Sequence, residues 1–189
     1  KSTVTVQKPD WLKRRLPTGP AFEQIKGMIG RDRLHTVCQE AKCPNIWECF
    51  SDKTATFLIL GSRCSRNCRF CSVPQGGLEP PDPGEPARVA RVSREMGLKY
   101  VVITSVTRDD LADGGAGIFA ETIQEIQNQI PDACVEVLIP DFQGVKEALF
   151  TVLDAKPDVL NHNIETVAGL YPRVRPQANY RRSLQLIKR

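Results

Sequence analysis

Six of the seven cysteines in this chain of 189 residues lie close together, in two groups of three. The later group, which we call the second triplet, is Cys64, Cys68 and Cys71, with the spacing C-x3-C-x2-C. Three thiolates on one tight loop can each bind one iron of a [4Fe–4S] cluster. Since most such clusters use four cysteines, the fourth iron stays open to another ligand. An open metal position is typical of catalytic sites, so the spacing predicts a catalytic iron–sulfur cluster.

Two other interpretations of the second triplet are a structural zinc site and a ferredoxin-like electron carrier. Zinc sites usually take four ligands from paired CxxC or CxxC/HxxxH motifs, and the sequence contains no such pair of motifs. Arg63, Arg66 and Arg69 lie within or beside the triplet. Their positive charge would offset the negative charge of a thiolate-bound cluster. The iron–sulfur interpretation is therefore favoured.

The first triplet consists of Cys38, Cys43 and Cys49, with the spacing C-x4-C-x5-C. This spacing alone does not say which metal is bound, because zinc and an iron–sulfur cluster fit it equally well. A short connection joins the two triplets, so both can face the same mouth of the fold. The seventh cysteine, Cys134, stands alone in an apolar stretch and is expected to be a small buried residue.

Composition and charge restrict the class of protein further. No apolar run approaches eighteen residues, so no transmembrane helix is predicted, and residues 1–20 lack the apolar core of a signal peptide. Clustered thiols then indicate metal binding in a reducing compartment. We expect the protein to lie in the cytoplasm, or in an organellar matrix if a targeting peptide was removed.

Charge is unevenly distributed along the chain. Residues 1–35 carry 8 Lys/Arg against 3 Asp/Glu, and residues 171–189 carry 6 Lys/Arg and no Asp/Glu. These basic ends indicate either a solvated surface or contact with an acidic partner or nucleic acid.

Apolar runs alternate with segments of helical periodicity through most of the chain. Buried strands are predicted at residues 55–61, 100–106, 134–139 and 159–164, and helices at 20–34, 86–96, 118–130, 145–153 and 180–189. Successive β-then-α units imply a parallel sheet. About four units do not close a barrel. The predicted fold class is therefore α/β, a partial (β/α) barrel of the TIM type, truncated after these units and preceded by a cysteine-rich extension.

The groups that could do chemistry follow the carboxyl ends of the predicted strands, where active sites lie in such folds. They are the second triplet, the run 107–110, Asp141, Asn163 and Glu165. Gly114 and Gly115 are expected to form a flexible loop. His162 is expected to be a hydrogen-bonded histidine rather than a ligand, because its side chain alternates in direction with its neighbours on the strand.

The second triplet after a strand, with an aromatic residue, Phe70, before its last cysteine, resembles the radical SAM superfamily (SAM, S-adenosylmethionine). The first triplet just upstream narrows this to a resemblance to the lipoyl synthase family. The surrounding segments agree with that resemblance over nearly the whole chain beyond the N-terminal arm: EAKCPN at 40–45, TATF at 54–57, CRFC at 68–71, SVTRDDLADGGA at 105–116 and NHNIET at 161–166.

The resemblance implies an enzyme that inserts two sulfur atoms at C6 and C8 of an octanoyl chain held on a lysine of a carrier protein. The second triplet would ligate the [4Fe–4S] cluster that binds and cleaves SAM. The first triplet would ligate an auxiliary [4Fe–4S] cluster that is consumed as the sulfur source. Implied partners are an octanoylated lipoyl carrier protein or domain (an E2 subunit or the glycine cleavage H protein), an electron donor and an iron–sulfur carrier. No membrane or nucleic-acid partner is implied.

Four residues near the strand ends are candidates for cofactor binding. Thr107, Asn163 and Glu165 would bind SAM, and Arg108 would bind SAM or substrate. Helix capping and a salt bridge are the alternative roles of Thr107 and Arg108, and solvated loop positions are the alternative for Asn163 and Glu165. No catalytic residue beyond the cluster ligands is assigned.

The expected domains are an arm with the auxiliary-cluster segment at residues 1–53 and the partial barrel at 54–189. The last predicted helix runs to the final residue, so the chain is expected to be the front part of a longer protein. The family's fourth auxiliary ligand, a serine, would lie beyond Arg189. Two competing functions are a radical SAM enzyme acting on tRNA, suggested by the basic ends, and a non-catalytic electron-transfer module.

Overall fold

One five-stranded sheet organises the computed structural model, which describes residues 9, 20–40, 43 and 56–189. Its strand order is β1-β2-β3-β4-β5. The strands are β1 (His35–Thr36), β2 (Thr56–Ile59), β3 (Tyr100–Ser105), β4 (Cys134–Leu138) and β5 (Val159–Asn161). β2 to β5 are parallel, and β1 pairs antiparallel with β2. The sheet ends at β1 and β5 without closing, so the predicted α/β class and partial barrel are confirmed.

Helices follow the parallel strands as the sequence predicts. They are α1 (Pro20–Arg31), α2 (Val37–Glu40), α4 (Glu85–Met96), α5 (Ala116–Gln129), α6 (Lys146–Asp154), α7 (Tyr171–Val174) and α8 (Tyr180–Lys188), with short 3-10 turns η2 (Phe142–Gly144) and η3 (Ala168–Leu170). The first turn of α4 contains Pro86, and its end is capped by Gly97 in the left-handed conformation. The short elements β1, α2 and α7 were not predicted, because two to four residues carry too little periodicity.

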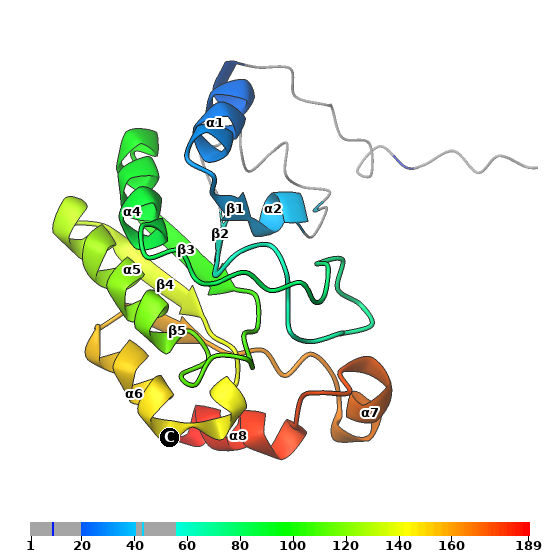
Figure 1. The fold of residues 1–189 in the computed structure, drawn as a ribbon. Coiled ribbons are helices and arrows are strands. Elements are labelled where there is room, and N and C mark those ends of the chain that lie inside the picture. The colour runs from blue at the N-terminus through cyan, green and yellow to red at the C-terminus, as the bar shows by residue number, and fades with distance from the viewer. Residues whose placement is uncertain (1–8, 10–19, 41–42, 44–55) are drawn as a thin grey trace, which may run out of the picture.

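The core lies between the sheet and the layer formed by α4, α5 and α6, which cover one face (Figure 1). Its largest fully buried side chains come from both layers: Phe57, Ile103 and Val135 from strands, and Val89, Phe119, Ile123 and Ile126 from helices. Burying such apolar side chains stabilises the fold by about 1.5–3 kcal/mol each. Cys134 opens β4 and is only partly buried. The expectation that it is buried was therefore too strong, since it lies at the strand's exposed start.

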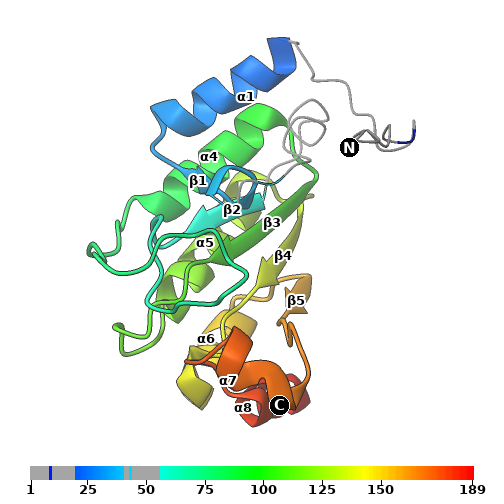
Figure 2. The ribbon, with the colours of Figure 1, turned by 90° about the vertical axis from the view of Figure 1, so that its right-hand side faces the viewer.

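The carboxyl ends of the parallel strands share one edge of the sheet, and long loops gather there (Figure 2). The loop after β2 holds the second triplet, the loop after β3 holds residues 106–115, and the segment after β5 leads through α7 to α8. Gly115 in the β3 loop has a φ of +89°, and a Cβ there would come within 2.2 Å of Leu60 Cδ1. This glycine therefore permits close packing rather than flexibility.

Candidate functional site

The loop of the second triplet is closed on itself by backbone hydrogen bonds. Cys64 N–H donates to the carbonyl of Pro74 at 2.8 Å, and Gly76 N–H donates to the carbonyl of Cys64 at 3.0 Å. The Cys71 amide donates to the carbonyl of Cys68 at 3.1 Å and forms a tight turn. Because these bonds fix the backbone between the three cysteines, the loop presents its thiols as one unit.

All three thiols of the second triplet line one cavity of about 170 Å³ at the carboxyl ends of the strands. Its apolar wall is formed by Leu58, Phe70, Val73, Val106, Leu138, Ile139 and Pro140, and its polar wall by Thr104, Ser105, Thr107, His162, Asn163, Glu165 and Arg175. Contributions come from β2, β3, β4 and the segment after β5. The parallel arrangement thus brings residues 58 and 175, far apart in sequence, to one site.

The donor set of this cavity fits an iron–sulfur cluster. The second triplet carries free thiols. Within the residues that the structure describes, no three Cys, His, Asp or Glu side chains converge on the position of a single ion. A single zinc ion needs ligands at about 2.3 Å from one point, whereas each thiolate of a cubic cluster binds its own iron. Three cysteines around one cavity match the three-thiolate donor set that such a cluster can take.

Three of the four predicted cofactor-binding residues lie in this cavity: Thr107, Asn163 and Glu165. Asn163 Nδ2 donates to Glu165 Oε1 at 3.0 Å, so the two side chains are held as a pair. Glu165 has a φ of +65°, an uncommon backbone conformation for a residue other than glycine. The structure therefore gathers these residues beside the second triplet, although their assignment to SAM stays a prediction.

Arg108 does not share the cavity. Its buried guanidinium binds the Asp110 carboxylate at 2.7 and 2.9 Å and the Leu60 carbonyl at 3.3 Å. It lines a separate cavity of about 350 Å³ with Arg33, Arg63 and Arg88 among others. Thr107 and Arg108 are neighbours in the chain but line different cavities. The salt bridge that was the alternative role of Arg108 is present.

Arg175 is a site residue that sequence reasoning missed. It follows α7, its Nη1 donates to the carbonyl of Asn163 at 3.1 Å, and its Nε is buried without a hydrogen-bond partner among the described residues. Burial raises the pKa of the Cys68 thiol, and a hydrogen bond from Arg175 partly offsets that rise. The only sequence signal was the general basic character of residues 171–189, which does not single out Arg175.

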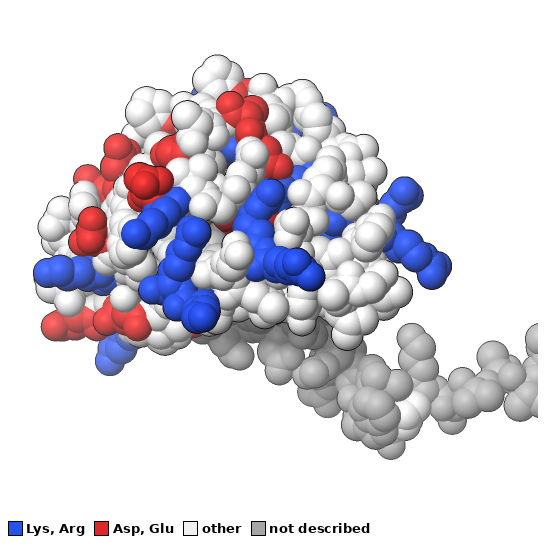
Figure 3. Space-filling model, turned by 90° about the horizontal axis from the view of Figure 1, so that it is seen from below, with Lys and Arg blue, Asp and Glu red and all other residues white. Residues whose placement is uncertain are grey.

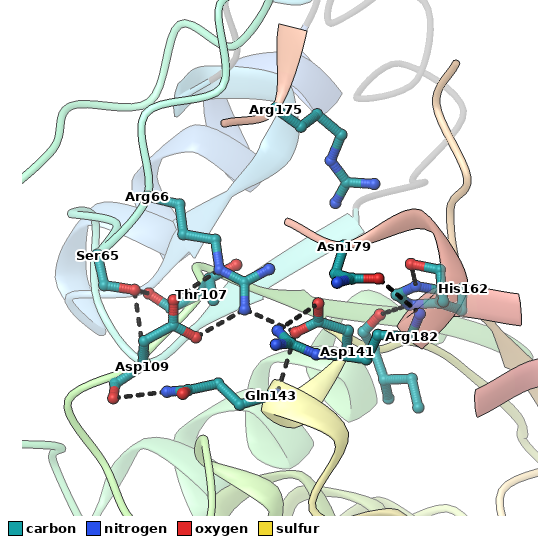
Figure 4. A network of polar contacts seen from close by, with 12 residues as sticks. Ser65, Arg66, Thr107, Asp109, Asp141, Gln143, His162, Arg175, Asn179 and Arg182 are labelled. Carbon is teal, nitrogen blue, oxygen red and sulfur yellow. Dashed lines mark hydrogen bonds and ion pairs between the residues drawn. The ribbon is translucent and has the colours of Figure 1, made fainter. Parts of the chain in front are cut away.

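Arg66, between the first two cysteines of the second triplet, is the centre of a buried ionic network (Figure 4). Its guanidinium binds Asp109 at 2.6 and 2.8 Å and Asp141 at 2.6 Å. Burial acts to lower the pKa of Arg66, but hydrogen bonds with Asp109 and Asp141 raise it above its usual value. Burial likewise acts to raise the pKa of Asp141, and the contact with Arg66 brings it below its usual value. Arg66 and Asp141 are therefore both ionised at neutral pH.

His162 is a satisfied histidine, as expected. Its Nδ1 lies 2.8 Å from the carbonyl of Ile139, and its Nε2 lies 2.8 Å from Ser183 Oγ. A carbonyl only accepts, so Nδ1 carries the proton and Nε2 accepts from the serine hydroxyl. Burial lowers the pKa of this imidazole. His162 thus joins β5 to α8 in its neutral form.

The first triplet is described only in part. Cys38 lies buried in α2, and Cys43 N–H donates to the carbonyl of Cys38 at 3.1 Å. α2 contacts both β1 and β2, which places these two cysteines beside the start of the barrel. Cys49 lies outside the described residues. The metal held by the first triplet stays a prediction.

Parallel strands followed by helices, with a three-cysteine loop after the first parallel strand, define the class of protein. Residues 58–189 match the model of the radical SAM superfamily. The chain belongs to this superfamily.

The chain is also similar to proteins named lipoyl synthase. Residues 1–43 match the N-terminal domain of lipoyl synthase. The chain is 58% identical over 181 residues to a lipoyl synthase of Oleidesulfovibrio alaskensis, covering 96% of this chain and 62% of the relative. It is 56% identical over 182 residues to one of Alkaliphilus metalliredigens, covering 96% and 63%. The chain therefore spans slightly less than two thirds of these relatives' length.

None of the helices within the described ranges is long and apolar enough to span a membrane.

Proposed function

We propose that this chain supplies the SAM-cleaving part of a lipoyl synthase, which inserts sulfur at C6 and C8 of a protein-bound octanoyl chain. The observation that carries the proposal is the single cavity shared by the second triplet, Thr107, Asn163 and Glu165. The similarity to proteins named lipoyl synthase supports the choice of reaction. The two segments 1–53 and 54–189 would divide the work between auxiliary cluster and barrel.

The second triplet would hold a [4Fe–4S] cluster, which together with SAM supplies radical chemistry able to remove hydrogen from an unactivated carbon. An octanoyl methylene has no useful acidity, so acid–base groups cannot act on it. The chain's own residues would exclude water and orient the reactants. Leu58, Val106 and Leu138 supply an apolar wall, and a dry cavity protects reactive species from side reactions.

The polar wall of the cavity would bind the charged and hydroxyl groups of SAM. The Glu165 carboxylate can accept hydrogen bonds from ribose hydroxyls, and the Asn163 amide that already donates to it restricts its orientation. Arg175 offers a buried Nε–H that has no hydrogen-bond partner in the described part of the chain and that suits a carboxylate. Thr107 contributes a hydroxyl from the β3 side. These groups would orient SAM from two sides of the cavity.

The first triplet would hold the auxiliary [4Fe–4S] cluster that donates sulfur. Cys38 and Cys43 lie next to β1 and β2, on the same chain segment that precedes the second triplet. A carbon radical needs sulfur held beside it, and a second cluster can supply that sulfur. We assign the third ligand to Cys49 on the resemblance alone.

The proposed partners are an octanoylated lipoyl carrier domain, an electron donor and an iron–sulfur carrier, with the bacterial cytoplasm as the compartment. Lys and Arg side chains gather on the face seen from below, on the side of α8 (Figure 3). α8 itself contributes Arg181, Arg182 and Lys188. A basic face of this kind favours encounter with an acidic domain. The choice of carrier rests on the resemblance.

The direct test is mass spectrometry of an octanoylated carrier domain after anaerobic incubation with the intact protein, iron, sulfide, SAM and a reductant. The proposal predicts that the carrier gains two sulfur atoms as a dithiol, and that two hydrogens are lost only when this dithiol is afterwards oxidised to the cyclic disulfide. Cleavage of SAM without any gain of sulfur on the carrier, combined with modification of tRNA in a parallel incubation, would contradict it. Cleavage of SAM by neither incubation would favour the electron-transfer alternative.

A further inference from the structure

Arg66 connects its own loop, which holds the second triplet, to the loops that follow β3 and β4. Its side chain is only 2% exposed, and it contacts Asp109 from the loop after β3 and Asp141 from the loop after β4. Arg66 itself belongs to the loop after β2. It does not line the cavity of the cysteines. The guanidinium therefore anchors the cysteine loop to the two neighbouring strand ends rather than touching a bound molecule.

The two carboxylates that receive Arg66 are themselves held in place (Figure 4). Asp141 Oδ1 accepts the backbone N–H of Gln143 at 3.1 Å, and its Oδ2 lies 3.3 Å from Arg182 Nη1. Gln143 Nε2 donates to the backbone carbonyl of Asp109 at 2.9 Å. These contacts connect Arg182 of α8 to Asp141, and Gln143 of η2 to Asp109 in the loop after β3. Both carboxylates that bind Arg66 are therefore restrained by a second residue.

Ser65 strengthens the same connection beside Arg66. Its hydroxyl donates to the carbonyl of Thr107 at 2.9 Å and accepts the backbone N–H of Asp109 at 3.0 Å. The Ser65 amide also donates to the Thr107 carbonyl at 2.9 Å. Thr107 lines the cavity, so the position of the cavity wall and that of the cysteine loop are coupled.

The backbone of Arg66 reaches the second triplet directly. Its N–H donates to Cys64 Sγ at 3.4 Å. Hydrogen bonds to cluster sulfurs are among the factors that set the reduction potential of iron–sulfur clusters. The residue that anchors the loop through its side chain therefore also places a donor on a cluster ligand through its backbone.

These contacts revise the role that charge alone suggested for Arg66. The positive charge of Arg66 was expected to offset the charge of a cluster, but the carboxylates of Asp109 and Asp141 already compensate it. An arginine whose charge is compensated acts through geometry, since a guanidinium binds carboxylates in a fixed, bidentate arrangement.

We propose that Arg66 is a positioning residue: its anchorage to Asp109 and Asp141 fixes the cysteine loop against the strand ends and holds its N–H on Cys64, which raises the reduction potential of the cluster bound there. This inference rests on the proposed function only in requiring that the second triplet binds a redox-active cluster. It does not depend on sulfur insertion.

The test compares Arg66→Gln and Arg66→Lys with the parent in the intact protein. Amide hydrogen exchange of the protein before cluster assembly reports the loop itself. In Arg66→Gln, the amides of residues 65–71 and 109 should exchange about tenfold faster or more. Arg66→Lys keeps the charge but cannot bind Asp109 bidentately while also reaching Asp141, and it should restore protection only in part.

The second readout is the midpoint potential of the cluster whose electron paramagnetic resonance signal responds to SAM. Loosening the loop weakens the N–H contact on Cys64, so Arg66→Gln should lower this potential. The matched control is Arg91→Gln, which removes an arginine from buried Asp32 on α1's carboxyl-terminal side, away from the cavity. In Arg91→Gln, the amide exchange rates around the second triplet and the midpoint potential of the cluster should equal those of the parent.

The proposal is overturned if Arg66→Gln changes neither the amide exchange of the cysteine loop nor the midpoint potential of the cluster. It is also overturned if Arg91→Gln changes both quantities as much as Arg66→Gln does. A parent that fails to assemble any SAM-responsive cluster contradicts the proposed function, whereas the hydrogen exchange still decides whether Arg66 anchors the loop. A parent that assembles the cluster but leaves the octanoyl chain unmodified contradicts sulfur insertion and leaves the role of Arg66 standing.

Discussion

At the scale of single residues, the site depends on charges that are buried and compensated. Asp141 is 1% exposed and faces both Arg66 and Arg182. Such a carboxylate can stay ionised only while its partners remain, because an uncompensated charge in a protein interior costs several kcal/mol. The ionised states of Arg66, Asp141 and Arg182 therefore depend on one another.

The substitution Asp141→Asn should lower the free energy of unfolding by about 3 kcal/mol at neutral pH, because it breaks a buried ion pair. The folded state holds the pKa of Asp141 below its usual 3.8. Its contribution to stability is thus complete above that value and is lost as the pH falls through the folded pKa. Denaturant unfolding should show the gap between parent and variant narrowing below pH ~4.

Asp154→Asn is the control for this experiment, since Asp154 is exposed on α6. It should change stability by less than about 0.5 kcal/mol at either pH. A difference between Asp141→Asn and the parent that stays constant from neutral to acid pH would show that Asp141 is not held ionised by Arg66.

Arg175→Gln should weaken SAM binding about tenfold or more, since a hydrogen bond to a charged group contributes about 1.5–3 kcal/mol. Arg175 faces the cavity, and its Nε has no partner among the described residues. Equilibrium binding of SAM to the reconstituted protein measures the effect. Arg173→Gln, on the exposed side of α7, should bind SAM like the parent. Equal affinity in both variants would remove Arg175 from the SAM site.

At the scale of elements, close packing of the β3 loop against the end of β2 sets the shape of the site. Leu60 follows β2, has a φ of +68°, and packs against Gly115. Its amide donates to the buried Glu85 carboxylate of α4 at 2.8 Å. These contacts fix the point at which the chain leaves the strand and enters the cysteine loop.

Gly115→Ala should destabilise the fold by about 1–3 kcal/mol, because the new Cβ would overlap Leu60 and the positive φ is unfavourable for alanine. Thermal or denaturant unfolding measures the change. Gly30→Ala, in α1 with open space around the new Cβ, should be neutral or stabilise by up to about 1 kcal/mol. Equal effects of the two substitutions would contradict the packing role of Gly115.

The sequence predicted these elements where periodicity or burial was strong. The apolar runs from Thr56 and from Tyr100 became parallel strands, and their shared edge brought Thr107 and Asn163 to the cysteines. Arg108 could not be placed, because neighbouring residues in a loop can face different cavities. Arg175 and the partners of Arg66 also escaped prediction. Arg66 contacts Asp109 and Asp141, which lie 43 and 75 residues further along the chain. Arg175 lies beyond α7, far in the sequence from the cysteines whose cavity it lines.

At the scale of the whole molecule, the two cysteine triplets lie on one short stretch of the sequence. Cys38 of the first triplet lies in α2 against β1 and β2, and the second triplet lines the cavity at the carboxyl ends of the strands. In the proposed function, the second triplet binds the cluster that cleaves SAM and the first triplet supplies sulfur. Because the two tasks lie on different side chains, they should be separable by substitution.

The most direct test measures 5′-deoxyadenosine formed from SAM by the anaerobically reconstituted intact protein and by its Cys38→Ala and Cys64→Ala variants. The account predicts about eight irons per chain in the parent and about four in Cys38→Ala, as expected for two [4Fe–4S] clusters and for one. Cys38→Ala should still cleave SAM, and Cys64→Ala should not. Cleavage of SAM by Cys64→Ala, or its loss in Cys38→Ala despite four bound irons, would contradict the assignment.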